Sequence, residues 1–164
     1  MPTQDEPVVE GVEVRDTGRG KFQVEVHATG VTFLADEPMA AGGLGSGPTP
    51  YDLMGSALGA CTAMTLRLYA DRKSWPLRSV TVRVLHRRDG LAAKDRFARE
   101  IVLEGDLSED QRRRLLEIAN RCPLHQTLER GSDIMTVLAE KPLAGRLDPE
   151  PTDHVVDMIT ACQD

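Results

Sequence analysis

Three cysteines are the residues of this 164-residue chain most able to do chemistry, and Cys122 has the most informative neighbours. It directly precedes Pro123, at the expected entrance to a short helix. Unpaired backbone N–H groups and the positive end of the dipole at a helix start favour a thiolate over a thiol. Arg121 and His125 lie close in the sequence and can add positive potential. Cys122 is therefore either an exchange-active thiol or a small apolar residue at a helix end, and its neighbours alone favour neither.

Cys61 lies in the middle of an apolar stripe on a predicted helix. Five residues recur at spacings of three and four and so share one helix face: Leu53, Ala57, Cys61, Met64 and Leu68. A cysteine on such a face is most often an inert core residue, and burial raises the pKa of a thiol. A reactive Cys61 would need a cation from elsewhere in the fold. Arg19, in the turn at 18–20, is the candidate, although arginines in turns are more often solvated.

A metal site is another use for these side chains. Cys122 and His125 have ligand-like spacing, and Cys61 or Cys162 could join them. Structural zinc sites usually contain two such pairs, and this chain contains one. We therefore expect no metal ion and no other cofactor, and keep a structural or metal-bound domain as the third hypothesis.

The helix that carries Cys61 has a clear start. Thr49 can cap it, Pro50 suits the first helical position, and Asp52 falls three residues after the cap, where an acid completes a capping box. The run SWP at 74–76 ends the helix. Asp52 thus has a plain structural role beside any role near a thiolate.

The other elements are short strands and helices. Alternation of apolar and polar residues predicts strands at 11–14, 22–27 and 31–34 in an antiparallel meander, then at 80–86, 97–103 and 134–139. Ser108 and Gln111 form a capping box for a helix whose buried side carries Leu115, Ile118, Ala119 and Cys122. A short helix runs from Pro123 to Glu129 and ends at Gly131. This order predicts an α+β fold, with helices packed against antiparallel sheet.

Composition excludes several kinds of partner. The formal net charge is −6, and the dense basic run Arg112–Arg114 has acids beside it, so we interpret it as a solvated helix face and expect no nucleic-acid partner. No stretch approaches the roughly 18 apolar residues of a membrane span. The first ten residues, MPTQDEPVVE, lack the basic and apolar regions of a secretory signal. We therefore expect a cytoplasmic protein with no membrane partner and no structural disulfide framework.

Two stretches resemble the cysteine motifs of the OsmC/Ohr family of thiol redox proteins. The first is GPTPYDLM at 47–54 followed by ALGACT at 57–62, and the second is NRCPLHQTL at 120–128. The resemblance extends from about Val12 to Glu140 and includes a GG-x-G loop at 42–45. We expect a single OsmC-like domain over residues 1–140 and a C-terminal extension of unknown role over residues 141–164. The resemblance implies antiparallel sheets around the long central helix that carries Cys61, in an intertwined homodimer with active sites at the subunit interface.

The resemblance also implies an antioxidant activity in the oxidative stress response, as a thiol-dependent peroxidase of organic hydroperoxides and, less efficiently, of hydrogen peroxide. Cys61 would attack the peroxide oxygen as a thiolate and become a sulfenic acid, and Cys122 would resolve it to a disulfide. An external dithiol, such as a lipoylated protein, would then reduce that disulfide. A buried, apolar Cys61 suits a lipid-like hydroperoxide, and a low-pKa Cys122 suits a disulfide that must be reopened.

The chain departs from the family pattern at one position. The family's peroxidases stabilise the thiolate with an arginine from the N-terminal strand–turn region, which Arg19 matches best, and partner it with a glutamate at the start of the cysteine helix. Tyr51 stands at that position, ten residues before Cys61, and Asp52 comes one later, about 100° around the helix axis. We take Arg19 and Asp52 as candidate catalytic residues with Cys61 and Cys122. The departure motivates an alternative, a thiol redox switch or small-ligand-binding protein with little or no turnover.

Overall fold

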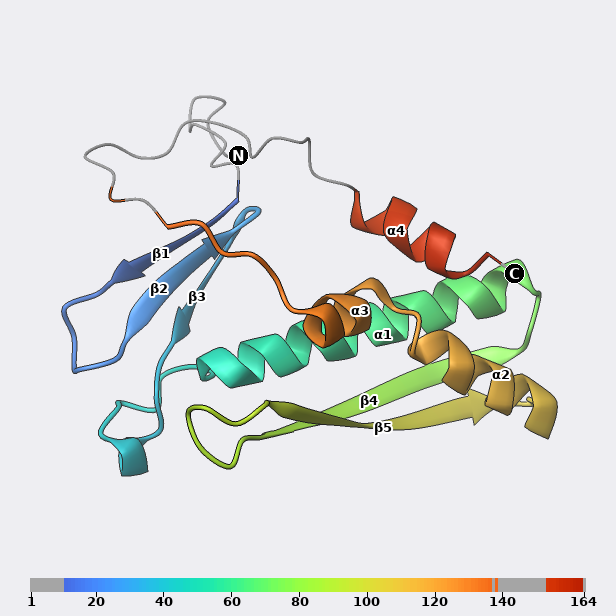
Figure 1. Cartoon of the computed structure of the whole chain (residues 1–164), viewed down its shortest axis with the longest axis horizontal. Coiled ribbons are helices and arrows are strands. Elements are labelled where there is room, and N and C mark those ends of the chain that lie inside the picture. The colour runs from blue at the N-terminus through green and yellow to red at the C-terminus, as the bar shows by residue number, and fades with distance from the viewer. Residues whose placement is uncertain (1–10, 137, 139–152, 164) are drawn as a thin grey trace. The chain divides into compact units, whose positions relative to one another are not determined.

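The computed structural model describes residues 11–136, 138 and 153–163, which form two compact units (Figure 1). The first spans Met1–Leu53 and the second Met54–Asp164. Antiparallel strands and helices, one of them long, confirm the α+β prediction. A single domain over residues 1–140, the role of the extension after it and the intertwined dimer stay predictions.

The first unit contains the predicted antiparallel meander. Strands β1 (Val12–Asp16), β2 (Val24–Ala28) and β3 (Val31–Ala35) pair in that order. The β1–β2 connection turns through Gly18 and Gly20, whose φ angles of 68° and 63° favour glycine. The unit therefore holds Arg19 at the tip of a tight turn.

The loop after β3 is organised around the side chain of Asp36. Its carboxylate accepts hydrogen bonds from the Ser46 hydroxyl (2.7 Å) and from backbone N–H groups, including that of Leu44. The Ser46 hydrogen bond is the main reason that the pKa of Asp36 lies below its ordinary value. A Cβ on Gly43 would lie 2.0 Å from the carbonyl oxygen of Glu37, so only glycine fits there. The glycine-rich motif thus builds a rigid loop, which includes the short helix η1 (Met39–Ala41).

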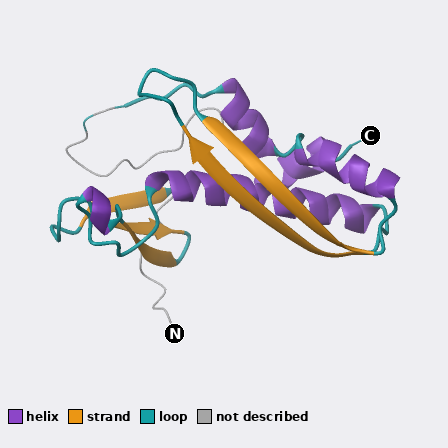
Figure 2. Ribbon diagram, turned by 90° about the horizontal axis from the view of Figure 1, so that it is seen from below, coloured by secondary structure: helices purple, strands orange, loops and turns teal. Residues whose placement is uncertain are grey.

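The second unit packs helices against a β-hairpin. Helix α1 (Pro50–Arg72) runs along the long ribbon of β4 (Leu77–Arg87) and β5 (Arg96–Gly105), which Figure 2 shows crossing it. Gly55 faces the ribbon at Val84, where an added Cβ would make an ordinary van der Waals contact at 3.6 Å.

Three shorter helices complete this unit. They are α2 (Glu109–Ala119), α3 (Pro123–Arg130) and α4 (His154–Ala161). The predicted capping box of α2 is confirmed, with Ser108 and Gln111 bonded reciprocally. Its predicted buried side is confirmed as well, because Leu115, Ile118 and Ala119 are fully buried in the main core.

The basic run on α2 is only partly solvated. Arg113 is exposed and pairs with Asp110, as expected of a surface residue. Arg112 instead donates to the carbonyl oxygen of Leu103 at 2.9 Å and to that of Gly105 at 3.2 Å, at the end of β5. The interpretation of the whole run as a solvated face was therefore wrong for Arg112, which ties α2 to the hairpin.

The buried face of α1 differs from the predicted stripe. Cys61 is buried, but Met64 is 54% exposed. The buried residues of α1 are Gly55, Leu58, Cys61, Thr62, Thr65, Leu66, Tyr69 and Ala70. Thr62 and Thr65 can lie on this face because their hydroxyls donate to the carbonyl oxygens of Leu58 and Cys61, each at 2.7 Å. Their polar groups are thereby satisfied, and the helix buries a face that a search for apolar residues misses.

The last predicted strand, over residues 134–139, is wrong where the structure describes it. Residues 134–136 and 138 form no strand, and residues 137 and 139 lie outside the described part. Ile134 and Met135 are each 86% exposed, and Leu138 is fully exposed. These residues have strand-like side chains, but no neighbouring strand of the described chain pairs with them.

Candidate active site

The second unit brings Cys61 and Cys122 together. Cys61 projects from the middle of α1, and Cys122 is the N-cap of α3, followed by Pro123 at the helix start. With Leu58 they form one buried cluster, in which Cys61 is 2% exposed and Cys122 is 0% exposed. Both are free thiols, and they hydrogen-bond to each other. The expectation that Cys122 lies at a helix entrance is confirmed.

The first turn of α3 supplies a backbone donor to each sulfur. The N–H of Leu124 donates to Cys61 Sγ and the N–H of His125 donates to Cys122 Sγ, both at 3.4 Å. The hydroxyl of Thr62 lies 3.7 Å from Cys122 Sγ. These N–H groups have no carbonyl partner within the helix, so the sulfurs satisfy them. The same contacts favour negative charge on sulfur.

The pKa values of Cys61 and Cys122 are shifted in opposite directions. The pKa of Cys122 is lowered to about 5, first by the hydrogen bond from Cys61, against the opposing effect of burial. The N–H of His125, the Thr62 hydroxyl and the positive charge of Arg99 lower it further. The hydrogen bond with Cys122, followed by burial, raises the pKa of Cys61. The two thiols therefore titrate as a coupled pair, and the donors and the cation around Cys122 favour negative charge on that side.

Arg99 is the cation closest to Cys122 in this network, and sequence reasoning did not single it out. It lies on β5, and its Nη1 donates to Thr62 Oγ1 at 2.8 Å and to the carbonyl oxygen of Ala119 at 2.9 Å. Its Nη2 donates to Asn120 Oδ1 at 3.0 Å. A signal was present, because Arg99 occupies an inward position of a strand whose other inward residues are mostly apolar.

Arg99 also fixes the protonation pattern of His125. Arg99 Nη2 lies 2.8 Å from His125 Nδ1, and a guanidinium can only donate, so Nδ1 is the acceptor. The ring proton of neutral His125 is therefore on Nε2, which faces the Glu129 carboxylate at 3.6 Å. Arg99 thus orders the first turn of α3 around Cys122.

His154, at the start of α4, also reaches the cysteines. Its Nε2 lies 3.2 Å from Cys61 Sγ, although 93 residues separate the two in sequence. Sequence reasoning missed this contact because His154 belongs to no motif and lies in the C-terminal segment outside the resemblance.

The remaining two candidate residues lie in the first unit. The Asp52 carboxylate accepts from the N–H and the hydroxyl of Thr49, at 2.9 and 2.8 Å, and these hydrogen bonds lower its pKa. The predicted helix-capping role of Asp52 is thus confirmed. Arg19 is exposed in the β1–β2 turn. Because the cysteines belong to the second unit, the catalytic roles of Arg19 and Asp52 stay predictions.

A pocket of about 500 Å³ adjoins the cysteine cluster. Its walls include three residues that pack in or against the cluster, Leu58, Phe97 and Leu128. Arg99 and His125 also line it. Leu58 thus connects the pocket to the cluster, while neither cysteine is among the residues that line it.

A family model described as OsmC-like protein matches residues 43–137, which is more than half of the chain. The chain belongs to this family. Solved structures agree on the fold of this OsmC-like protein. An OsmC-like protein from Mycoplasma pneumoniae is 17% identical, with a TM-score of 0.61, over 73% of this chain and 86% of that one.

Two organic hydroperoxide resistance proteins also share the fold. One, from Legionella pneumophila, is 21% identical with a TM-score of 0.56, over 71% of this chain and 86% of that one. The other, from Bacillus subtilis, is 20% identical with a TM-score of 0.52, over 71% and 87%. No curated protein matches the chain. At these identities the two structures support the fold of this chain.

The described residues contain neither a membrane-crossing helix nor a metal-binding group of side chains. No helix in that part of the chain is long and apolar enough to cross a membrane. Nor do its His, Cys, Asp and Glu side chains form a group of three that could hold a metal ion.

Proposed function

We propose that this protein is a thiol-dependent peroxidase that reduces organic hydroperoxides, and hydrogen peroxide less efficiently, with Cys61 and Cys122. The observation that carries the proposal is the hydrogen-bonded pair of buried thiols at the first turn of α3. A thiolate and a thiol in contact can be joined by two-electron oxidation with little movement of the chain. Membership of the OsmC-like family supports the same chemistry.

The reaction has two chemical steps. Cys61, as a thiolate, attacks one oxygen of the hydroperoxide, the O–O bond breaks, and the products are a Cys61 sulfenic acid and an alkoxide that takes up a proton. The Cys122 thiolate then attacks the sulfur of Cys61, and hydroxide leaves and is protonated to water. One hydroperoxide becomes one alcohol, and two thiols become one disulfide. An external dithiol, such as a lipoylated protein, restores both thiols by disulfide exchange.

The pocket beside the cluster supports an organic substrate. Leu58, Phe97 and Leu128 offer an apolar surface to an alkyl or aryl group, and Arg99 adds a positive charge to the wall of the same pocket. Hydrogen peroxide gains nothing from the apolar walls. We therefore propose that the kcat/KM for cumene hydroperoxide exceeds that for hydrogen peroxide.

Burial of the thiols favours one alternative. Cys61 and Cys122 are 2% and 0% exposed, so side chains must move before a peroxide or a dithiol reaches them. A thiol switch that is oxidised once, with little turnover, has the same requirement. Catalytic consumption of cumene hydroperoxide with dihydrolipoamide separates the two, because a switch stops after one equivalent.

We also propose a homodimer that works in the reducing cytoplasm. The exposed apolar side chains of Ile134, Met135 and Leu138 support a second copy that covers this segment. Oligomeric state by light scattering tests the dimer independently of the chemistry.

Intact mass and thiol counting test the reaction. One equivalent of cumene hydroperoxide should remove two thiols and about 2 Da from the wild type, as one disulfide. In Cys122→Ser, a sulfenic acid should be trapped at Cys61, and Cys162→Ser serves as the control with the dithiol pair intact. If Cys61 and Cys122 survive unchanged, the proposal fails. A sulfenic acid trapped at Cys122 in Cys61→Ser, with none at Cys61, would exchange the two roles.

A further inference from the structure

Helix α4 lies outside the residues that match the family model, yet it is built into the second unit. Asp153 caps it by accepting from the N–H of Val155 at 2.8 Å. Met158 and Cys162 are 6% and 3% exposed, and Cys162 belongs to the main core. The Cys162 thiol donates to the carbonyl oxygen of Thr65 on α1 at 3.8 Å. The helix is therefore anchored along its length by its own buried side chains.

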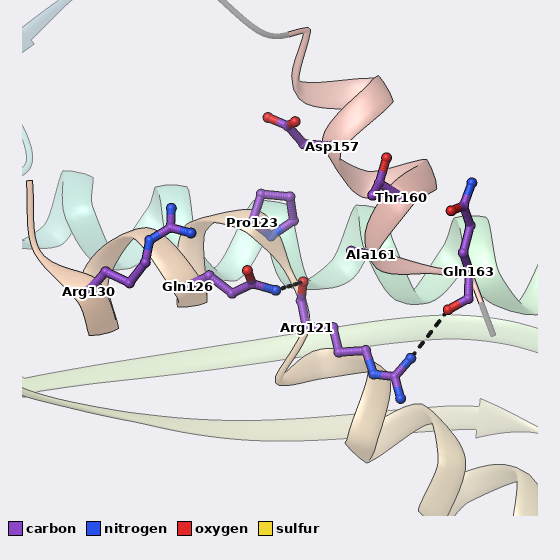
Figure 3. A pocket seen from close by; sticks show the side chains of 8 residues that line it. All are labelled: Arg121, Pro123, Gln126, Arg130, Asp157, Thr160, Ala161 and Gln163. Carbon is purple, nitrogen blue, oxygen red and sulfur yellow. Dashed lines mark hydrogen bonds between the residues drawn. The ribbon is translucent and has the colours of Figure 1, made fainter.

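A hydrogen bond also joins the residues that follow α4 to the segment that carries Cys122. Arg121 Nη1 donates to the carbonyl oxygen of Gln163 at 3.5 Å, and Gln126 Nε2 donates to the carbonyl oxygen of Arg121 at 3.0 Å (Figure 3). These side chains and Pro123 line a pocket of about 410 Å³ between α3 and α4. Helices α3 and α4 therefore lie next to each other, and both reach the cysteine pair.

His154 is the residue through which α4 meets the reacting atoms. It is the first residue of the helix and half-buried, and its Nε2 lies 3.2 Å from Cys61 Sγ. The other polar groups given for this sulfur in the described residues are the N–H of Leu124, the Cys122 thiol and the Thr65 hydroxyl. An N–H can stabilise a thiolate but cannot take its proton. The imidazole nitrogen of His154 can accept a proton, and it contacts Cys61.

We propose that His154 is the proton acceptor that converts Cys61 into the attacking thiolate, an inference that rests on the proposed peroxidase function. A histidine suits this task because the imidazole changes charge nearest to neutral pH. His154 places an ionisable group beside the sulfur of Cys61.

The choice of His154 over Cys122 follows from what each must do next. If Cys122 took the proton, it would become a thiol and could not attack the sulfenic acid until it lost that proton again. With the proton on His154, Cys122 keeps its own thiolate for the attack on the sulfenic acid.

The proton and electron balance is complete. The Cys61 proton passes to His154 Nε2, the thiolate attacks the peroxide oxygen, and the O–O bond breaks with its electron pair on the departing alkoxide. The imidazolium returns its proton to that alkoxide, which leaves as the alcohol. His154 is neutral again when Cys122 closes the disulfide.

Other titratable or charged groups lie on the elements around the pair. From α3 they are Cys122 and His125, from β5 Arg99, from the α2–α3 junction Arg121, and from α4 itself Asp153 and Asp157. The test therefore compares proteins that differ at His154 alone. The other groups stay in place except Cys122, which is replaced in both proteins because its thiol would obscure the reaction of Cys61.

The experiment uses Cys122→Ser/Cys162→Ser, in which Cys61 is the only thiol. We measure the rate of alkylation of Cys61 by iodoacetamide from pH 5 to 10, with thiolate absorbance at 240 nm in parallel. In this background, His154→Gln should move the alkylation profile upward by at least about one pH unit, so that the rate at pH 7 falls about tenfold or more. His27→Gln, an imidazole on β2, is the matched control and should leave the profile in place.

The result that overturns the proposal is an unchanged profile in His154→Gln. His154→Asn is measured alongside, with circular dichroism for both variants, so that the outcome does not depend on one replacement. Alkylation needs no peroxide, so the two proposals can fail separately. A shifted profile in a protein that forms no sulfenic acid keeps His154 as the base and rejects the peroxidase. A sulfenic acid formed at equal rates with and without His154 keeps the peroxidase and rejects His154 as the base.

Discussion

Replacing Arg99 tests whether one half-buried cation lowers the pKa of Cys122. Arg99 Nη1 lies 2.8 Å from Thr62 Oγ1, which lies 3.7 Å from Cys122 Sγ. The guanidinium nitrogen and the sulfur are therefore at most about 6.5 Å apart, where two unit charges attract by about 2.6 kcal/mol at an effective dielectric constant of 20. Arg99 is half-buried, and solvent screening reduces this to about half. About 1.3 kcal/mol corresponds to about one pKa unit.

Arg99→Met should accordingly raise the pKa of Cys122 from about 5 towards 6. The direction follows because the lost positive charge had favoured the thiolate. In a Cys162→Ser background, the onset of thiolate absorbance at 240 nm should move up by about one pH unit, and reaction with monobromobimane at pH 5.5 should fall several-fold.

Arg99→Lys is the matched control, because it keeps the charge but loses the fork that binds Thr62 and His125 together. It should hold the pKa of Cys122 closer to the wild-type value than the methionine variant does. An onset that does not move in Arg99→Met would refute the assignment of the cation. An equal shift in both variants would show that Arg99 acts by ordering α3 and not by its charge.

Two further predictions concern stability. Asp52→Ala should lower the free energy of unfolding by about 0.5–1 kcal/mol in urea titrations, because the N–H of Thr49 and the start of α1 lose an acidic partner; equal stability would contradict the capping role. The second is a pH dependence. Because the folded state lowers the pKa of Cys122 from 9.0 to about 5, the ionised thiol stabilises the fold fully above about pH 9, and this stabilisation is lost as the pH falls to 5. Between pH 5 and 8 the unfolding free energy of the wild type should rise with pH relative to Cys122→Ser, by at most about 1.4 kcal/mol per unit. Parallel curves for the two proteins would contradict the lowered pKa.

Features that depend on neighbouring residues in the sequence were predicted well. The capping box of Ser108 and Gln111 and the position of Cys122 before Pro123 each depend on residues no more than three apart, and the structure contains both. The paired strands of the meander and the hairpin also follow from local alternation. In each case the physical cause lies within one short segment of the chain.

Features that depend on distant partners could not be predicted from the sequence. Thr62 is buried because its hydroxyl bonds back to Leu58, which removes the cost that a polar residue normally carries. Arg99 lies 37 residues from Thr62, and no spacing rule connects them. The strand expected over 134–139 fails for the converse reason, since its side chains suit a strand but pairing requires a neighbour.

The two cysteines draw their support from different parts of the chain. Cys122 is held by His125, Thr62 and Arg99, all within the residues that the family model matches. Cys61 receives a backbone donor from that same region, but its imidazole comes from α4, beyond it. A thiolate ready for disulfide exchange is therefore a property of the family core in this chain. The reactivity of Cys61 depends in addition on the C-terminal helix, so changes in that helix should alter the rate of oxidation before they alter the pKa of Cys122.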